Sequence, residues 1–142
     1  MTAHAGRILA IDYGSKRVGV AVSDPLRVIA QGVTTLDNDE RLLPTLGVMI
    51  REQEATCILV GMPYSADGGK GPKALEVEQF IERLRKASDV RIDTWDESYS
   101  SVNAHRVFVE IGMKRKKRHE KRRVDEMAAR LMLQEYLDHL PP

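Results

Sequence analysis

Three acidic residues, Asp12, Glu97 and Asp125, have the types and positions that metal-assisted chemistry requires. Asp12 ends an apolar run, Glu97 follows a β-rich run directly after Asp96, and Asp125 comes just after the basic segment 114–123. Carboxylate oxygens are the ligands that Mg²⁺ and Mn²⁺ prefer, and two such ions can activate a water and stabilise the leaving oxygen of a phosphodiester. If the fold gathers the three carboxylates, we expect them to be the metal ligands and catalytic residues of a nuclease that uses two Mg²⁺ or Mn²⁺ ions.

Each of these acidic residues also has a structural interpretation, which the sequence leaves open. Asp12 lies close before Gly14 and Ser15, and an aspartate ahead of such a pair can initiate a turn. Glu97 lies where a strand is expected to end, so it can belong to an acidic loop or cap a helix. Asp125 is expected at the start of a helix, where a carboxylate complements the helix dipole. None of the three is therefore diagnostic by itself.

The segment at residues 114–123, KRKKRHEKRR, contains eight lysines and arginines and one glutamate. The whole chain has a net charge of only +1, so the rest of the protein is acidic. A dense cationic segment on an acidic body is typical of a protein that binds nucleic acid, although a solvated basic loop would have the same composition. The residues expected to contact phosphate are Lys114, Arg115, Lys116, Lys117, Arg118, Lys121, Arg122 and Arg123.

The length and composition restrict the class of protein. A chain of 142 residues, 42% of them hydrophobic, can form its own core, and we expect a single domain over residues 1–142. Cys57 is the only cysteine, which excludes an internal disulfide and indicates a buried core residue, and the four histidines have no ligand spacing. No apolar run approaches the roughly 18 residues of a membrane span, and no signal peptide is evident. We therefore expect a cytoplasmic protein, either a monomer or a homodimer.

Five runs have the composition of β-strands. Gly14, Ser15 and Lys16 join the first two as a hairpin, and the fourth is continuously apolar, as in a strand covered on both faces. The predicted strands cover residues 7–13, 17–23, 28–36, 56–62 and 90–95.

Helices are expected between and after these strands. Asp37 and Glu40 have the spacing of a capping box, which predicts a helix that runs to about Glu54. The other helices are predicted at residues 73–86, 100–111 and 124–139. The element order predicts an α/β fold with a mixed five-stranded sheet, in which an antiparallel meander is joined to two parallel strands, and helices cover both faces.

Four motifs in this order resemble the YqgF/RuvX family, whose members are described as Holliday junction resolvases and as pre-16S rRNA nucleases. The motifs are IDYGSKRVGVAVSD at residues 11–24, ILVGMPYSADGG at 58–69, DESYSSVNA at 96–104 and VDEMAARLML at 124–133. The resemblance extends over essentially the whole chain and implies an RNase H-like fold with the first strand at the centre of the sheet. It also implies that Asp12, Glu97 and Asp125 form an acidic metal site.

One position departs from the family pattern. Ser98 stands where the family usually has an arginine directly after the Asp-Glu pair. If that arginine holds phosphate, the role passes here to another cation or is lost. Lys16, Arg17 and Lys70 are the candidates for nucleic-acid binding outside the basic segment.

The expected activity is the hydrolysis of phosphodiester bonds in structured nucleic acid. The substrate would be either a DNA junction, as in recombination and repair, or a ribosomal RNA precursor, as in ribosome biogenesis. The alternative is a non-catalytic nucleic-acid-binding or ribosome-assembly factor with the same fold. An actin-like nucleotide-binding protein is disfavoured, because such proteins need two lobes and 142 residues supply one.

Overall fold

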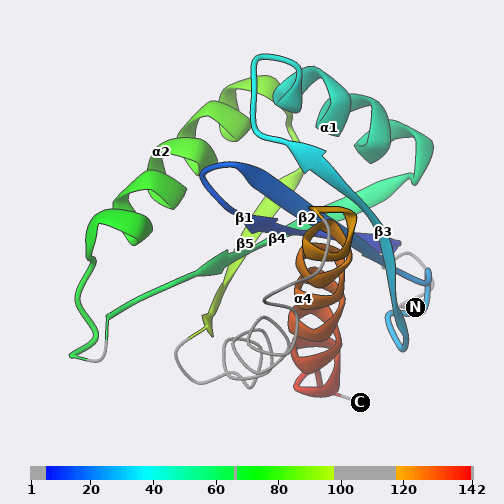
Figure 1. Cartoon of the computed structure of the whole chain (residues 1–142). Helices are drawn as coiled ribbons and strands as arrows, with labels where there is room; N and C mark the ends of the chain where they lie inside the picture. The colour runs from blue at the N-terminus through cyan, green and yellow to red at the C-terminus, as the bar shows by residue number, and fades with distance from the viewer. Residues whose placement is uncertain (1–5, 66, 98–117, 142) are drawn as a thin grey trace.

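The fold is built on one mixed sheet of five strands. The computed structural model describes residues 6–65, 67–97 and 118–141. The strands are β1 (Arg7–Tyr13), β2 (Arg17–Ser23), β3 (Ala30–Asp37), β4 (Ala55–Met62) and β5 (Arg91–Asp96). Their order across the sheet is β3-β2-β1-β4-β5, so β1 is central (Figure 1). β1, β2 and β3 form the predicted antiparallel meander, and β4 pairs parallel with both β1 and β5.

Helices cover the sheet on both faces. α1 (Leu42–Glu52) and α2 (Pro72–Ala87) lie on one face, and α4 (Arg118–Asp138) crosses the other (Figure 1). The prediction of an α/β fold with a mixed sheet between helices is therefore confirmed. No helix in the described part of the chain is long and apolar enough to span a membrane.

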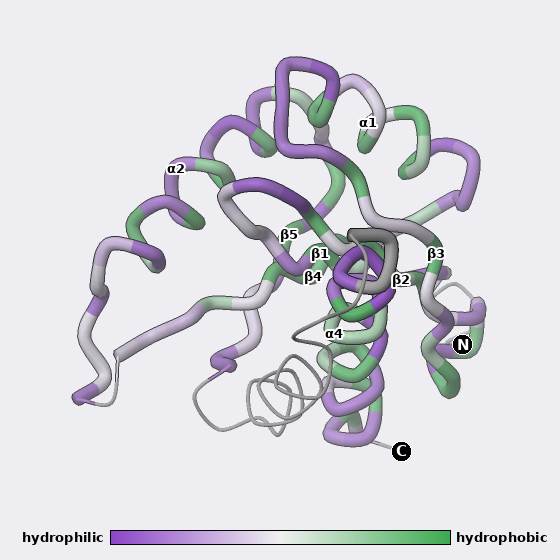
Figure 2. Tube along the Cα trace, viewed as in Figure 1, coloured by the Kyte–Doolittle hydropathy of each residue, from purple (hydrophilic) through white to green (hydrophobic). Residues whose placement is uncertain are grey.

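The side chains of the central strand alternate between two separate cores. Leu9 and Ile11 pack with α1 and α2, whereas Ile8 and Ala10 pack with α4. A strand that is buried on both faces needs apolar residues at every position, which is why β1 and β4 are largely hydrophobic along the chain trace (Figure 2). Asp12 interrupts this pattern, and it has the parity of Ile8 and Ala10.

The capping box predicted from Asp37 and Glu40 is wrong. α1 begins at Leu42, its N-cap residue is Arg41, and no side-chain hydrogen bond caps it. Asp37 instead extends β3, where it pairs in register with Arg17. Asp37 is therefore part of a strand pair, although the local pattern predicted it at the start of a helix.

The third strand also begins later than predicted, at Ala30. The Asp24 carboxylate accepts hydrogen bonds from the backbone N–H groups of Val28 and Ile29, at 2.7 and 2.8 Å, and these bonds close the loop between β2 and β3. Backbone hydrogen bonds, that of Ile29 above all, hold the pKa of Asp24 below its ordinary value.

The last helix is longer than the sequence predicts, because α4 begins at Arg118 rather than at Val124. Lysine and arginine are good helix formers, so residues 118–123 can continue the helix, and Asp37 of β3 pairs with Arg122 there. Asp125 therefore lies beyond the first turn, where the effect of the helix dipole is small. This position does not favour the interpretation that Asp125 is there to complement the helix dipole. The helix predicted at residues 100–111 lies outside the described residues.

Candidate active site

Asp12 is a buried carboxylate at the end of the central strand. Its exposed fraction is 6%, and its position on β1 directs it to the α4 face of the sheet. It pairs in register with Gly19 of β2, so it belongs to the strand ladder and not to the hairpin loop that follows. This position does not favour the interpretation of Asp12 as a turn-initiating residue.

Two glycines flank Asp12 in the neighbouring strands. Gly19 is its partner in β2, and Gly61 follows Val60, which pairs with Ile11 on the other side. A β-carbon added at Gly19 would lie 2.1 Å from the backbone oxygen of Asp125, and one added at Gly61 would lie 2.6 Å from Oε1 of Glu97. The space at Gly19 is therefore taken by the backbone at Asp125, and the space at Gly61 is shared by Glu97 and the sulfur of Met132, which is also 2.6 Å away.

Glu97 reaches this position because it directly follows β5. Its exposed fraction is 6%, and its carboxylate lies over Gly61 of the adjacent strand β4. The structure thus brings Asp12, Glu97 and the backbone of Asp125 together from a central strand, the end of an edge strand and a helix. Sequence reasoning missed the glycines, although Gly19 and Gly61 both interrupt apolar strands where a larger residue would be expected.

The three carboxylates do not form a ready metal site. Within residues 6–65, 67–97 and 118–141, no three histidine, cysteine, aspartate or glutamate side chains are arranged to hold an ion. One reason is that the Asp125 carboxylate binds Arg17, with 2.7 Å between Oδ2 and Nε. The two side chains of this pair are 13% and 31% exposed, respectively.

The predicted phosphate-binding cations differ in how far they are already engaged. Lys16, Lys121 and Arg123 are exposed. Lys70 forms an ion pair with Glu78 of α2, which raises the pKa of the Lys70 ammonium. Residues 114–117 lie outside the described residues, and the side chain of Arg118 is likewise not described.

Arg122 has a structural role that the sequence did not reveal. Its guanidinium donates to Asp37 Oδ1 at 2.8 Å and to the backbone oxygen of Thr35 at 2.6 Å. The Thr35 hydroxyl in turn donates to the backbone oxygen of Arg122. These contacts fasten the basic part of α4 to the edge strand β3, and they leave the Arg122 guanidinium already engaged within the protein.

Shallow hollows accompany this junction. One of about 300 Å³ is lined by Arg122, Arg123 and Glu126 together with β3 residues, and one of about 240 Å³ lies between β3, α1 and Arg122. Their lining is mixed in charge, because Arg41 is paired with Asp39 and Arg122 with Asp37, whereas Arg123 is exposed. We therefore assign no ligand to these hollows.

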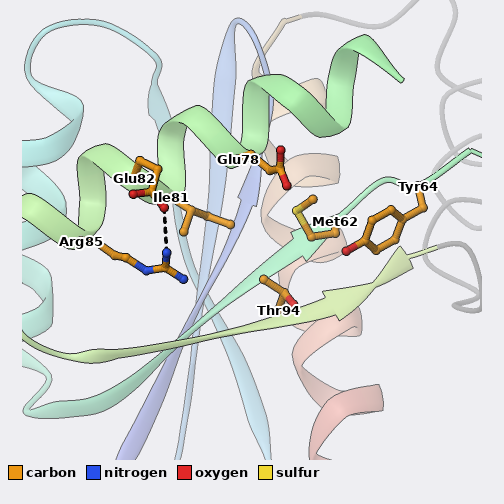
Figure 3. Close-up of a pocket in the computed structure, with 7 residues that line it drawn as sticks. All are labelled: Met62, Tyr64, Glu78, Ile81, Glu82, Arg85 and Thr94. Carbon is orange, nitrogen blue, oxygen red and sulfur yellow. Dashed lines mark hydrogen bonds and ion pairs between the residues drawn. The ribbon is translucent and has the colours of Figure 1, made fainter. Parts of the chain in front are cut away.

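A further hollow of about 330 Å³ lies on the opposite face of the sheet (Figure 3). It is lined by Met62, Tyr64, Glu78, Ile81, Glu82, Arg85 and Thr94. Arg85 is paired with Glu82 at 2.7 Å, and Tyr64 packs against the α1/α2 core. Because the sheet separates this hollow from Asp12, we do not include it in the candidate active site.

The C-terminal end of α4 packs against β5. Tyr136 donates a hydrogen bond to Asp93 at 3.0 Å and packs edge-on against Trp95, with 5.8 Å between ring centroids. Burial, with the Asp93 hydrogen bond, raises the pKa of Tyr136 to about 12. Cys57 lies in the same core, and burial raises the pKa of its thiol. The prediction that Cys57 is a core residue is confirmed.

The chain is similar over nearly its whole length to known proteins. The profile of the family described as "RuvX: Holliday junction resolvase" matches residues 6–139. A Roseiflexus protein named "Putative pre-16S rRNA nuclease" is 37% identical over 140 residues, which cover 97% of this chain and 98% of the relative. Proteins of the same name from Halothermothrix orenii and Clostridium perfringens are 42% and 43% identical; each match covers 94% of this chain, and 95% and 98% of the relatives, respectively.

Two solved structures of RuvC from Thermus thermophilus share the fold. The one in complex with a Holliday junction substrate has a TM-score of 0.60 at 12% identity and covers 93% of both chains. The other has a TM-score of 0.58 at 12% identity and covers 92% of this chain and 93% of RuvC. This structural similarity confirms the expected RNase H-like fold. The family membership rests on the sequence matches, which are 37–43% identical over nearly the whole chain. The chain belongs to the RuvX family.

Proposed function

We propose that this protein is a divalent-metal-dependent nuclease that hydrolyses phosphodiester bonds in structured nucleic acid. The observation that carries the proposal is the pair of glycines beside Asp12, which let Glu97 and α4 at Asp125 approach it closely. Asp12, Glu97 and Asp125 are the proposed metal ligands and catalytic residues. The names of the relatives support nuclease activity and favour a precursor of 16S rRNA as substrate, while the family description keeps a DNA junction as the other candidate.

The donor set fits Mg²⁺ or Mn²⁺, because all three proposed ligands are carboxylates and hard cations prefer oxygen. When bound, two such ions would activate the attacking water and stabilise the leaving oxygen. Asp12 and Glu97 are each 94% buried, so their side chains are held by the surrounding structure. Asp125 contributes once its carboxylate turns away from Arg17.

Nucleic-acid binding is assigned to cations around this site. Lys16 lies in the hairpin that follows β1, and Lys121 and Arg123 lie on the turns of α4 that precede Asp125. Together with the other cations of the basic segment, apart from Arg122, which is engaged at β3, they would bind the phosphate backbone without regard to sequence. A nuclease with a ribosomal RNA precursor as substrate would act in the cytoplasm, the location expected from the sequence.

One observation favours the second candidate, a non-catalytic nucleic-acid-binding factor. The described residues show no preformed three-ligand site, and an arginine binds the Asp125 carboxylate. A protein that had lost catalysis could keep this ion pair and still bind nucleic acid through its basic segment.

Cleavage of matched substrates tests the proposal. A labelled four-way DNA junction, a single-stranded DNA and a precursor-like RNA would each be incubated with Mn²⁺, Mg²⁺ or EDTA. We expect metal-dependent cutting by the wild-type protein and by Asp89→Asn, in which an exposed aspartate outside the site is changed, and none by Asp12→Asn. Cutting by Asp12→Asn at the wild-type rate would contradict the assigned site. Binding without any cutting by the wild-type protein would favour the non-catalytic factor.

A further inference from the structure

The ion pair between Arg17 and Asp125 lies within the proposed metal site. Arg17 Nε is 2.7 Å from Asp125 Oδ2, and the carboxylate is 13% exposed. Arg17 begins β2, and it has the same parity as Gly19, over which α4 packs. A cation of the protein itself therefore binds one of the carboxylates on which metal binding is proposed to depend.

Several contacts other than this ion pair hold α4 against the sheet. Arg122 fastens the helix to Thr35 and Asp37 of β3. Gln134 binds both the N–H of Ala30 and the carbonyl of Val28, at 2.9 and 3.0 Å. The apolar face of α4 is buried against the sheet, through Val124, Ala128, Ala129, Met132, Leu133 and Leu137. We therefore expect the helix to stay in place when the Arg17 contact is lost.

The Asp125 carboxylate needs a cationic partner, because it is only 13% exposed and a buried charge without a partner is costly. Arg17 supplies that partner in the structure, and a bound cation could supply it instead. A divalent ion brings twice the charge to the same oxygens, and a released guanidinium is well suited to binding phosphate. Arg17 directly follows the exposed Lys16 in the chain, so a phosphate bound by Lys16 would lie near Arg17.

We propose that Arg17 is a positioning residue that occupies Asp125 until a divalent ion binds, and then turns to a phosphate of the nucleic acid. This inference rests on the proposed function and adds that the binding of the ion and the binding of the nucleic acid are coupled through Arg17. Nucleic acid that attracts Arg17 frees Asp125 for the ion, and an ion that takes Asp125 frees Arg17 for phosphate. Because such coupling is reciprocal, each ligand raises the affinity for the other.

The movement of Arg17 can be observed directly in the wild-type protein by NMR of the arginine Nε–H groups. Arg17→Lys identifies the Arg17 signal, and Arg85 is the matched control, because it is paired with Glu82 at the same 2.7 Å on the other face of the sheet. Titration with Mg²⁺ is expected to shift the Arg17 signal and leave that of Arg85 unchanged. An Arg17 signal that stays in place while the ion binds would overturn the inference.

Calorimetry of ion binding provides a second readout. Arg17→Gln removes the competing charge, so we expect its affinity for Mn²⁺ to rise about fivefold, while Arg85→Gln keeps the wild-type affinity. A lower affinity in Arg17→Gln would mean that the pair helps Asp125 to bind the ion, which contradicts the inference.

The phosphate contact is tested with a labelled RNA hairpin that carries phosphorothioate linkages to slow cleavage. Arg17→Gln is expected to weaken hairpin binding more in Mg²⁺ than in EDTA, because only the ion releases Arg17. An equal loss in both conditions would indicate a merely structural role and would overturn the proposal.

Ion binding by Asp12→Asn separates failure of this inference from failure of the proposed function. If the wild-type protein binds no divalent ion, or Asp12→Asn binds it equally well, the proposed metal site is wrong and the role of Arg17 is wrong with it. If ion binding depends on Asp12 but the Arg17 signal does not respond, only the role of Arg17 is wrong.

Discussion

The two faces of the sheet are packed in different ways. The face under α1 and α2 buries large side chains, including Phe80, Leu46 and Met62. The face under α4 has small residues where the helix approaches most closely. At Gly19 the backbone of α4 lies so close to β2 that it leaves no room for a β-carbon. Large side chains fill a core but keep backbones apart, whereas glycine allows a helix to reach the strand that carries Asp12. Both faces therefore bury a core, but only the α4 face also brings the helix backbone close enough to build the site.

The largest effect on stability is expected on the α1/α2 face. Leu46 is fully buried there, and Leu46→Ala would lower the free energy of unfolding by about 2–5 kcal/mol through the lost burial and the cavity it leaves. Because Leu46 is on the face opposite Asp12, we expect the folded variant to keep its affinity for Mn²⁺. Urea denaturation and calorimetry measure the two quantities, and a large loss of ion affinity would show that the faces are not independent.

The same substitution should have opposite effects on the two faces. Gly19→Ala places a methyl group against the backbone of α4 and is expected to cost about 1–3 kcal/mol and to impair cleavage. Gly47→Ala lies within α1, where the nearest atom, of the flexible Arg51 side chain, is 3.9 Å away, and should stabilise the protein by about 0.5–1 kcal/mol. Denaturation curves of both variants provide the test. A neutral Gly19→Ala would show that α4 can shift without consequence.

Substitutions of two adjacent arginines of α4, Arg122 and Arg123, should have different effects: one on stability and the other on nucleic-acid binding. Arg122→Gln loses contacts to Asp37 and Thr35, so we expect a loss of about 1 kcal/mol in stability. Arg123→Gln should leave stability unchanged, weaken nucleic-acid binding, and reduce the slope of log affinity against log salt by about 1. Binding measured over a range of salt concentrations decides between them. The reverse pattern would contradict the assignment of Arg122 to the α4–β3 junction.

The smallest effect is expected at the far end of α4 and depends on pH. The pKa of Tyr136 is raised to about 12 in the folded protein, so the neutral phenol is favoured by folding. Its contribution is complete below pH 10, its ordinary pKa, and is lost as the pH rises towards 12. Tyr136→Phe should therefore cost about 0.5–1 kcal/mol at neutral pH, through the hydrogen bond to Asp93, and less at pH 11–12. A difference from the wild-type protein that stays constant up to pH 12 would contradict this.

Much of the fold could be predicted from local pattern. The apolar runs of β1 and β4 and the hairpin at Gly14 are encoded over short stretches, where side-chain parity and turn chemistry suffice. The start of α1 and the start of α4 could not be predicted in this way. Asp37 and Arg118 were misassigned because strand pairing between β2 and β3 and packing of the basic segment involve residues distant in sequence.

The sequence by itself determined the candidate acidic residues, the basic segment and the α/β order of elements, because residue type and periodicity are local properties. Only the tertiary structure decided which of these groups meet. It placed Glu97 and α4 over the glycines beside Asp12, joined Arg17 to Asp125, and fixed Arg122 at β3. The reason is physical: a close approach depends on which side chains are missing from neighbouring strands, and an ion pair depends on which charges the fold brings within contact.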